Sequence, residues 1–189
     1  MISKLTGLKI TPKRRSKETD PLKIFEALTL RGTVENIWDP QSDALRRWHL
    51  VRDKQDIVIE MNTGGGKTLI GLLMAQSLVN ETAGQVLYVC PTIQLIEQAR
   101  MRAAECGLEV ATYYDRHWWN EQAFVGAYGP CLTNYAAVFN GKSIFRRKAI
   151  RAFILDDAHV AGPNIRSSFT LRLASSTEAF SKIVELFEP

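Results

Sequence analysis

The chain has 189 residues, of which 46% are hydrophobic and 23% are charged, a composition typical of a globular domain with a real core. It contains no apolar run near the roughly 18 residues of a membrane-spanning helix and no apolar core of a signal peptide, so neither a membrane protein nor an exported protein is expected. The cysteines Cys90, Cys106 and Cys131 are widely separated without zinc-ligand spacing, which indicates reduced thiols in a cytoplasmic protein.

The net charge of +4 is distributed unevenly along the chain. Residues 1–17 contain six basic residues and no acid, and we expect a basic arm over residues 1–19 ahead of one domain over residues 20–189. A second acid-free cluster consists of Lys142, Arg146, Arg147, Lys148 and Arg151. Both clusters could contact nucleic-acid phosphates, although charge alone slightly favours a solvated tail and a solvated loop.

Proline and glycine signals divide the first half of the domain. Two Asp-Pro pairs predict helices over residues 20–30 and 41–52, because aspartate caps a helix and proline suits its first turn. The β-branched run over residues 57–59 is typical of a buried parallel strand. Three consecutive glycines then form a turn, and straight-chain apolar residues predict a helix over residues 68–80.

Strand and helix patterns continue to alternate in the second half. We expect a helix that Thr92 caps and that ends near Glu105, and a last helix behind a capping box of Ser175 and Glu178. His117–Trp119 is expected in a loop. Strands are expected at residues 86–90, 110–114 and 152–155, and less clearly at 123–128 and 131–132. This alternation predicts an α/β fold, a parallel sheet flanked by helices, with ligands beyond the carboxyl ends of the strands.

The glycine turn between the expected strand and helix forms an anion site. Gly64, Gly65 and Gly66 allow backbone N–H groups to face inward, and the helix N-terminus favours negative charge. Lys67 supplies a cation for the β- and γ-phosphates of a nucleotide, and Thr68 supplies a hydroxyl for Mg²⁺. The sequence therefore predicts binding of a nucleotide with Mg²⁺.

Two adjacent acids, Asp156 and Asp157, follow the last expected strand. Mg²⁺ on a nucleotide prefers oxygen ligands, and Asp156 is placed to help hold it near the Thr68 hydroxyl. Asp157 would then orient or deprotonate the attacking water. The alternative is a turn at the end of a strand with two solvated carboxylates.

Four segments together resemble the motifs of superfamily 2 DExH/DEAH-box helicases. They are similar to motif I (Met61–Thr68), motif Ia (Pro91–Gln98), motif Ib (Leu132–Tyr135) and motif II (Asp156–His159, the DEAH box with aspartate in place of glutamate). Their order over residues 20–188 is that of the first, ATP-binding domain of these enzymes. The resemblance implies a RecA-like P-loop NTPase domain that uses ATP and Mg²⁺.

The resemblance also implies roles for individual residues. Lys67 and Asp157 would act in catalysis, Thr68 and Asp156 would hold the metal, and His159 would couple the ATP site to the nucleic-acid site. Nucleic acid would contact Pro91, Thr92 and Thr133. Nucleotide contacts would come from Gln41, which stands where the family has an adenine-reading glutamine, and from Thr63, Gly64, Gly65, Gly66, Lys67, Thr68 and Leu69.

The resemblance implies partners as well. Full activity of this family needs a second RecA-like domain or a partner subunit, and neither that domain nor motif III is found, since Ser175–Thr177 fits a helix cap better. Ile93-Gln94 replaces the Arg-Glu of the DEAD-box RNA branch, so DNA is somewhat favoured over RNA as the nucleic acid. The expected function is a helicase or translocase that couples ATP hydrolysis to movement on nucleic acid. The alternatives are an adaptor that binds ATP without hydrolysing it and a translocase subunit of a nuclease or restriction machine.

Overall fold

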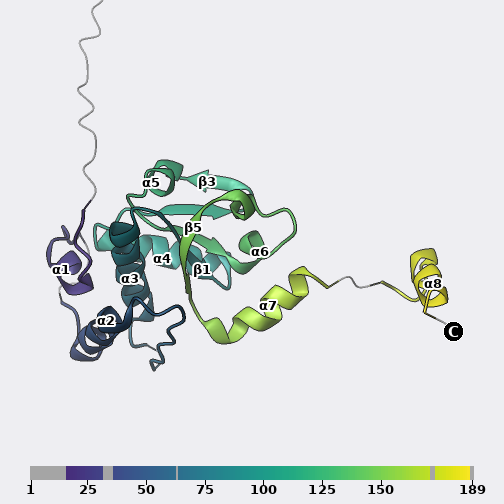
Figure 1. Ribbon diagram of the computed structural model, residues 1–189, viewed down its shortest axis with the longest axis horizontal. Coiled ribbons are helices and arrows are strands. Elements are labelled where there is room, and N and C mark those ends of the chain that lie inside the picture. Colours follow the sequence, from purple (N-terminus) through teal and green to yellow (C-terminus); the bar gives the residue numbers. More distant parts are fainter. Residues whose placement is uncertain (1–15, 32–35, 63, 171–172, 188–189) are drawn as a thin grey trace, which may run out of the picture.

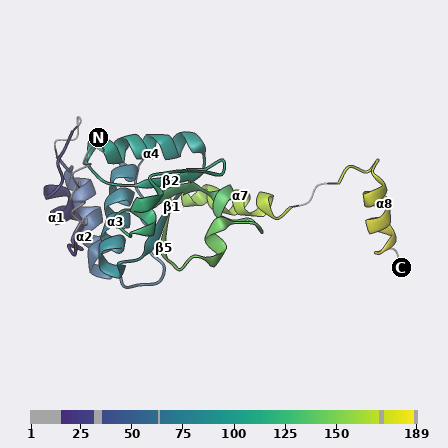
Figure 2. The ribbon, with the colours of Figure 1, turned by 90° about the horizontal axis from the view of Figure 1, so that it is seen from above.

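The computed structural model describes residues 16–31, 36–62, 64–170 and 173–187, so most of the expected basic arm lies outside the described residues. A five-stranded sheet with the order β3-β2-β4-β1-β5 forms the centre, and helices lie on both of its faces (Figures 1 and 2). The strands are β1 (Gln85–Cys90), β2 (Ala111–Tyr114), β3 (His117–Trp119), β4 (Cys131–Asn134) and β5 (Ile150–Leu155). The helices are α1 (Pro21–Glu26), α2 (Asp39–Val51), α3 (Lys67–Thr82), α4 (Ile93–Glu105), α5 (Glu121–Val125), α6 (Tyr135–Val138), α7 (Ala161–Ser168) and α8 (Glu178–Glu185), with 3₁₀ turns η1 (Ile144–Arg147) and η2 (Ala158–Val160).

The sheet is mostly parallel, as the alternating pattern predicted. Strand β1 pairs in parallel with β4 and with β5, and β2 pairs in parallel with β4. Strand β3 is the exception, because it pairs antiparallel with β2 through a tight hairpin. This architecture is that of a mixed α/β domain with the carboxyl ends of four strands at one edge, and it is consistent with a RecA-like helicase domain.

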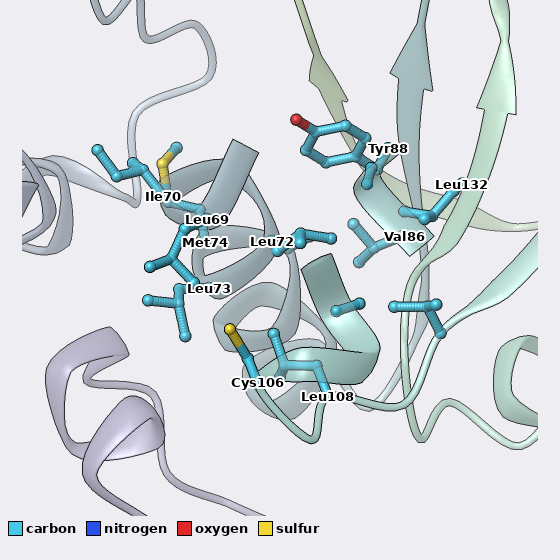
Figure 3. Packing of buried hydrophobic residues seen from close by; sticks show 14 of the residues in the cluster. Leu69, Ile70, Leu72, Leu73, Met74, Val86, Tyr88, Cys106, Leu108 and Leu132 are labelled. Carbon is cyan, nitrogen blue, oxygen red and sulfur yellow. The ribbon is translucent and has the colours of Figure 1, made fainter. Parts of the chain in front are cut away.

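Strand β1 lies at the centre of the core because both of its faces are covered. Val86, Tyr88 and Cys90 face one hydrophobic cluster, which α1, α2, α3 and α4 build (Figure 3). Leu87 and Val89 face a second cluster, which includes side chains of α5, α6, η1 and α7. A strand buried on both faces has a continuous apolar sequence rather than an alternating one, and the sequence of β1 shows this.

The expected strand over Ile57–Ile59 is wrong. This segment is extended but enters no ladder, and Val58 is 92% exposed while Ile57 and Ile59 are half-buried against the first cluster. A β-branched run becomes a strand only where a neighbouring edge offers hydrogen bonds, and no strand within the described ranges pairs with it. The edge strand β5 likewise leaves Phe153 and Leu155 exposed.

Two further segments differ from their predicted secondary structure. The segment His117–Trp119 is strand β3 rather than a loop, since Asp115 and Arg116 adopt left-handed conformations (φ 48° and 64°) that suit a two-residue hairpin turn. Residues 121–125 form helix α5 rather than a strand, and Phe124 is buried beside Trp118 at a ring-centroid distance of 5.7 Å. Trp118 is therefore partly buried and packs against the second cluster.

Helix boundaries follow their caps closely. Asp20 accepts a hydrogen bond from the Leu22 N–H and Thr92 from the Leu95 N–H, so α1 and α4 begin where the sequence predicted. The last helix, α8, is capped by Thr177 rather than by Ser175. It has no buried residue and lies away from the sheet (Figures 1 and 2). Within the described ranges no helix combines the length and apolar character that crossing a membrane requires.

The three cysteines provide a first test of this core. Burial raises the pKa of the Cys90, Cys106 and Cys131 thiols, and all three are buried and free of disulfides. Since the thiolate is the reactive form, we expect a thiol reagent at mildly alkaline pH to label none of them in the native chain. All three should react at the rate of a small thiol once guanidinium unfolds the chain. Labelling of the native protein at that rate would contradict this packing.

Candidate nucleotide-binding site

The glycine loop leads directly into α3. Gly64 and Gly66 have φ of 83° and 72°, in the left-handed region that favours glycine, and Gly66 caps the helix. The amides of the first helical turn that precede Leu69 have no earlier carbonyl of the helix to bond, so they point out of its N-terminus. This arrangement offers backbone donors and the positive end of a helix dipole to an anion.

The structure brings the glycine loop and the acidic pair together. Lys67 Nζ lies 3.4 Å from Asp157 Oδ1, although the two residues are 90 positions apart in the sequence. Both side chains are partly exposed, 40% for Lys67 and 33% for Asp157. The ion pair therefore lies in an accessible site rather than in the core, and it joins the start of α3 to the turn after β5.

Asp156 is held more firmly than its neighbour. Its backbone N–H donates to the Val89 carbonyl at 2.9 Å, and its own carbonyl accepts from the Tyr135 hydroxyl at 3.0 Å. Burial, and next the negative charge of Asp157, raise the pKa of the Asp156 carboxyl. A hydrogen bond from Tyr88 and the charge of Lys67 act in the opposite direction. The carboxylate thus lies partly buried at the carboxyl end of β5, near Tyr88, Lys67 and Asp157.

These oxygen donors suit a magnesium ion that arrives with a nucleotide. Among the residues that the structure describes, no three His, Cys, Asp or Glu side chains gather into a metal site. Mg²⁺ bound to phosphates needs no such cage, because it takes one or two protein oxygens and completes its shell with phosphate and water. Thr68, in the first turn of α3, and Asp156 are the residues that would supply them.

Gln41 lies against the glycine loop instead of facing solvent. It is 4% exposed, its amide N–H donates to the Gly65 carbonyl at 3.0 Å, and its Oε1 accepts from the Trp38 N–H at 3.2 Å. The sequence placed Gln41 near the nucleotide but did not predict that it binds the loop itself. In this arrangement Gln41 fixes the position of Gly65.

A groove that the sequence did not predict opens beside this contact. Its volume is about 790 Å³, and it lies between α2 and the extended segment before the glycine loop. Trp38, Gln41, Arg47, Met61 and Gly65 are among its lining residues, and Trp38 is 63% exposed. In the sequence, the feature that could have indicated this groove is the aromatic residue Trp38, three positions before Gln41.

The other expected site residues differ in how exposed they are. Thr92 is exposed at the start of α4 and Pro91 is half-buried beside it, on the edge of the sheet that carries Asp156. The imidazole of His159 is exposed in η2. Thr63 lies outside the described residues.

The side chains of two expected site residues, Thr133 and Leu69, are buried. Thr133 is fully buried and its hydroxyl donates to the Tyr113 carbonyl at 2.7 Å, so it is not available to a nucleic-acid phosphate. The Leu69 side chain lies in the first cluster. Its N–H donates to the Gly66 carbonyl at 3.1 Å, which leaves the loop residues before it as the anion donors.

Comparison with known proteins agrees with this geometry. Residues 35–189 match the family model described as "Type III restriction enzyme, res subunit". The chain belongs to this family. It is also similar to Helicase SWR1 of Kluyveromyces lactis, with 30% identity over 156 residues, which are 74% of this chain and 10% of that protein. Helicase SWR1 of Cryptococcus neoformans is 29% identical over 157 residues, 77% of this chain and 12% of that protein.

A third relative is Helicase swr-1 of Neurospora crassa, which is 27% identical over 150 residues, 75% of this chain and 8% of that protein. The chain thus spans about a tenth of the length of the curated relatives that it matches. The family and these helicases support the superfamily 2 helicase ATP-binding domain that the sequence motifs predicted.

The contact between Gln41 and the loop generates a test. A Cβ on Gly66 would collide with Gln41 Nε2, and Gly66 also needs a positive φ. We expect Gly66→Ala to lower the melting temperature and to weaken binding of a fluorescent ATP analogue. In a Gln41→Ala background the same change should cost less, because only the backbone strain of about 1–2 kcal/mol remains. An equal loss of melting temperature and of affinity in both backgrounds would show that the added methyl group does not contact Gln41.

Proposed function

We propose that this domain binds ATP with Mg²⁺ and hydrolyses it as the motor domain of a superfamily 2 helicase or translocase. The observation that carries the proposal is the 3.4 Å ion pair between Lys67 and Asp157, which unites the phosphate loop with the acidic turn. Phosphoryl transfer needs little covalent help from a protein, because positioning and charge stabilisation supply most of the catalysis. The residues at this edge of the sheet offer both.

Each residue has a distinct task in this proposal. Lys67 and the amides of Gly64–Lys67 stabilise the charge on the transferring phosphoryl group. Thr68 and Asp156 hold Mg²⁺, which supplies charge neutralisation when bound. Asp157 pairs with Lys67 in the structure. When Lys67 turns to phosphate, the Asp157 carboxylate is released and can accept a hydrogen bond from the attacking water.

Base recognition belongs to the groove beside α2. Gln41 contributes by holding Gly65, and the exposed ring of Trp38 offers a flat apolar surface to a purine. Adenine selection by Gln41 itself requires one of its present hydrogen bonds to be exchanged. We therefore propose that Gln41 acts first on the loop and second on the base.

Nucleic acid is proposed to lie at the carboxyl edge of the sheet. Pro91 and Thr92 follow β1 there, and DNA is somewhat favoured over RNA as the ligand. His159, exposed in η2 next to the acidic turn, would couple this surface to the ATP site. Of the second basic cluster, Arg146 and Arg147 are exposed, whereas Lys148 lies 5.9 Å from the Trp118 ring centroid. Full activity would need a second RecA-like domain or a partner subunit.

The family favours one biological setting over the others. Its description as the res subunit of a type III restriction enzyme supports a translocase subunit of a restriction machine. The names of the relatives support helicase activity more generally. The three buried free cysteines fit a cytoplasmic location.

Lys67 is the first residue to test. Lys67→Ala should weaken binding of a fluorescent ATP analogue by about tenfold or more, because it removes the mobile cation of the phosphate site; tenfold corresponds to about 1.4 kcal/mol. Circular dichroism and melting should change little, since the side chain is 40% exposed. Lys182→Ala, on α8 away from the sheet, is the matched control for loss of one charge. Equal affinity of wild type and Lys67→Ala would refute the phosphate site.

A substitution of Asp157 distinguishes a domain that hydrolyses ATP from an adaptor that only binds it. In a chain that also carries the second RecA-like domain, Asp157→Asn should retain binding of ATP and reduce nucleic-acid-stimulated hydrolysis by about a hundredfold, the usual cost of a misplaced reacting group. A wild-type protein that binds ATP but shows no stimulated hydrolysis would identify the adaptor instead. Full activity of Asp157→Asn would assign the water to another residue.

A further inference from the structure

Tyr88 lies where the apolar core meets the acidic turn. It occupies the middle of β1, opposite Ile154 of β5 and Leu132 of β4, and is 1% exposed. Its ring projects from the sheet toward α3, with the hydroxyl at the end nearer the helix (Figure 3). A phenylalanine would fill the same apolar space, so the hydroxyl is the part that needs a reason.

The position of this ring is fixed by a close approach of α3. A Cβ at Gly71 would lie 2.6 Å from Tyr88 Cε2 and 3.2 Å from its hydroxyl oxygen. Glycine inside a helix costs about 0.5–1 kcal/mol relative to alanine. Gly71 is one turn after Thr68, and its missing side chain makes room for the tyrosine under the first turn of α3. The helix that carries the phosphate loop therefore also holds the Tyr88 ring in place.

The register of β1 and β5 places Tyr88 beside Asp156. Asp156 follows Ile154, the partner of Tyr88, by two residues, so both side chains lie on the same face of the sheet. Burial raises the pKa of the Asp156 carboxyl, and hydrogen bonding from the Tyr88 hydroxyl lowers it. A second buried tyrosine, Tyr135 at the start of α6, donates to the backbone carbonyl of the same aspartate at 3.0 Å. Side chain and main chain of Asp156 are thus bound by hydroxyls from two different elements. A phenol donates a single proton, so the carboxylate keeps further lone pairs for a metal ion or its water.

We propose that Tyr88 is a positioning residue that orients the Asp156 carboxylate toward Mg²⁺ on the nucleotide. The inference rests on the proposed function, since it concerns how the same site receives its metal. Groups that hydrogen-bond to a metal ligand orient it, and their loss commonly lowers metal affinity 10- to 100-fold. Tyr88 touches neither the nucleotide nor the reacting atoms. Its effect passes through Asp156 alone.

The test is a Mg²⁺ titration of binding of a fluorescent ATP analogue to the full chain, with an EDTA arm. Tyr88→Phe keeps the ring and removes the hydroxyl. We expect unchanged affinity in EDTA and a rise of about tenfold in the Mg²⁺ concentration for half-maximal enhancement of binding. Tyr135→Phe is the matched control, because it removes a buried hydroxyl from the backbone of Asp156 and should leave the Mg²⁺ requirement closer to wild type.

Two further variants decide how Tyr88 acts. Asp156→Asn should raise the Mg²⁺ requirement, and adding Tyr88→Phe to it should cause no further rise, since the shared target is already lost. Gly71→Ala displaces the ring while keeping the hydroxyl, and improves intrinsic helix propensity. It should raise the Mg²⁺ requirement as Tyr88→Phe does, which protects the test against a Tyr88→Phe chain that fails to fold.

Three results would overturn the inference. They are an equal loss of affinity in EDTA and in Mg²⁺ for Tyr88→Phe, additive effects of Tyr88→Phe and Asp156→Asn, and a Mg²⁺ requirement that neither Tyr88→Phe nor Gly71→Ala changes. A wild-type chain that does not bind the ATP analogue in Mg²⁺ is a different result. It would refute the proposed function, and the inference with it.

Discussion

The burial of β1 on both faces is the constraint on which the rest of the structure depends. Fully burying one Leu or Val stabilises a protein by roughly 1.5–3 kcal/mol, whereas a partly exposed ion pair contributes about 0–1 kcal/mol. Packing of α3 over Val86 and Tyr88, with β5 paired to β1, therefore brings Lys67 near Asp157. Their ion pair is a result of that packing and contributes little to it. The chemistry of the site is thus positioned mainly by the packing of apolar groups beneath it.

Much of this arrangement could be predicted from local patterns. Apolar runs predicted β1 and β5, caps predicted the starts of α1 and α4, and the shared edge of parallel strands placed Asp156 near the glycine loop. These features depend on residues within one turn or one strand. Strand β3, helix α5 and the segment Ile57–Ile59 were predicted wrongly, because a short apolar run becomes a helix, a strand or neither according to distant neighbours.

The hydrogen-bond partners of single polar side chains could not be predicted from the sequence either, because they too depend on distant segments. Gln41 and Thr133 were expected to face ligands, yet each finds a backbone carbonyl inside the protein, from Gly65 and from Tyr113. A buried amide or hydroxyl must be satisfied, and the acceptor is supplied by a segment about 20 residues away or more. Sequence motifs identify the residue types at a site, and tertiary packing decides which atoms remain free.

The backbone at Asp157 bears on the position at which the resemblance to the DEAH box implies aspartate in place of glutamate. Its φ of 46° and ψ of 54° lie in the left-handed region, which asparagine, aspartate and glycine enter most readily among the amino acids. Glutamate at this position would have to bear the full conformational penalty without the short polar side chain that offsets it. The turn thus favours aspartate over glutamate at position 157, and substitutions there are tolerated best by residues that accept this conformation.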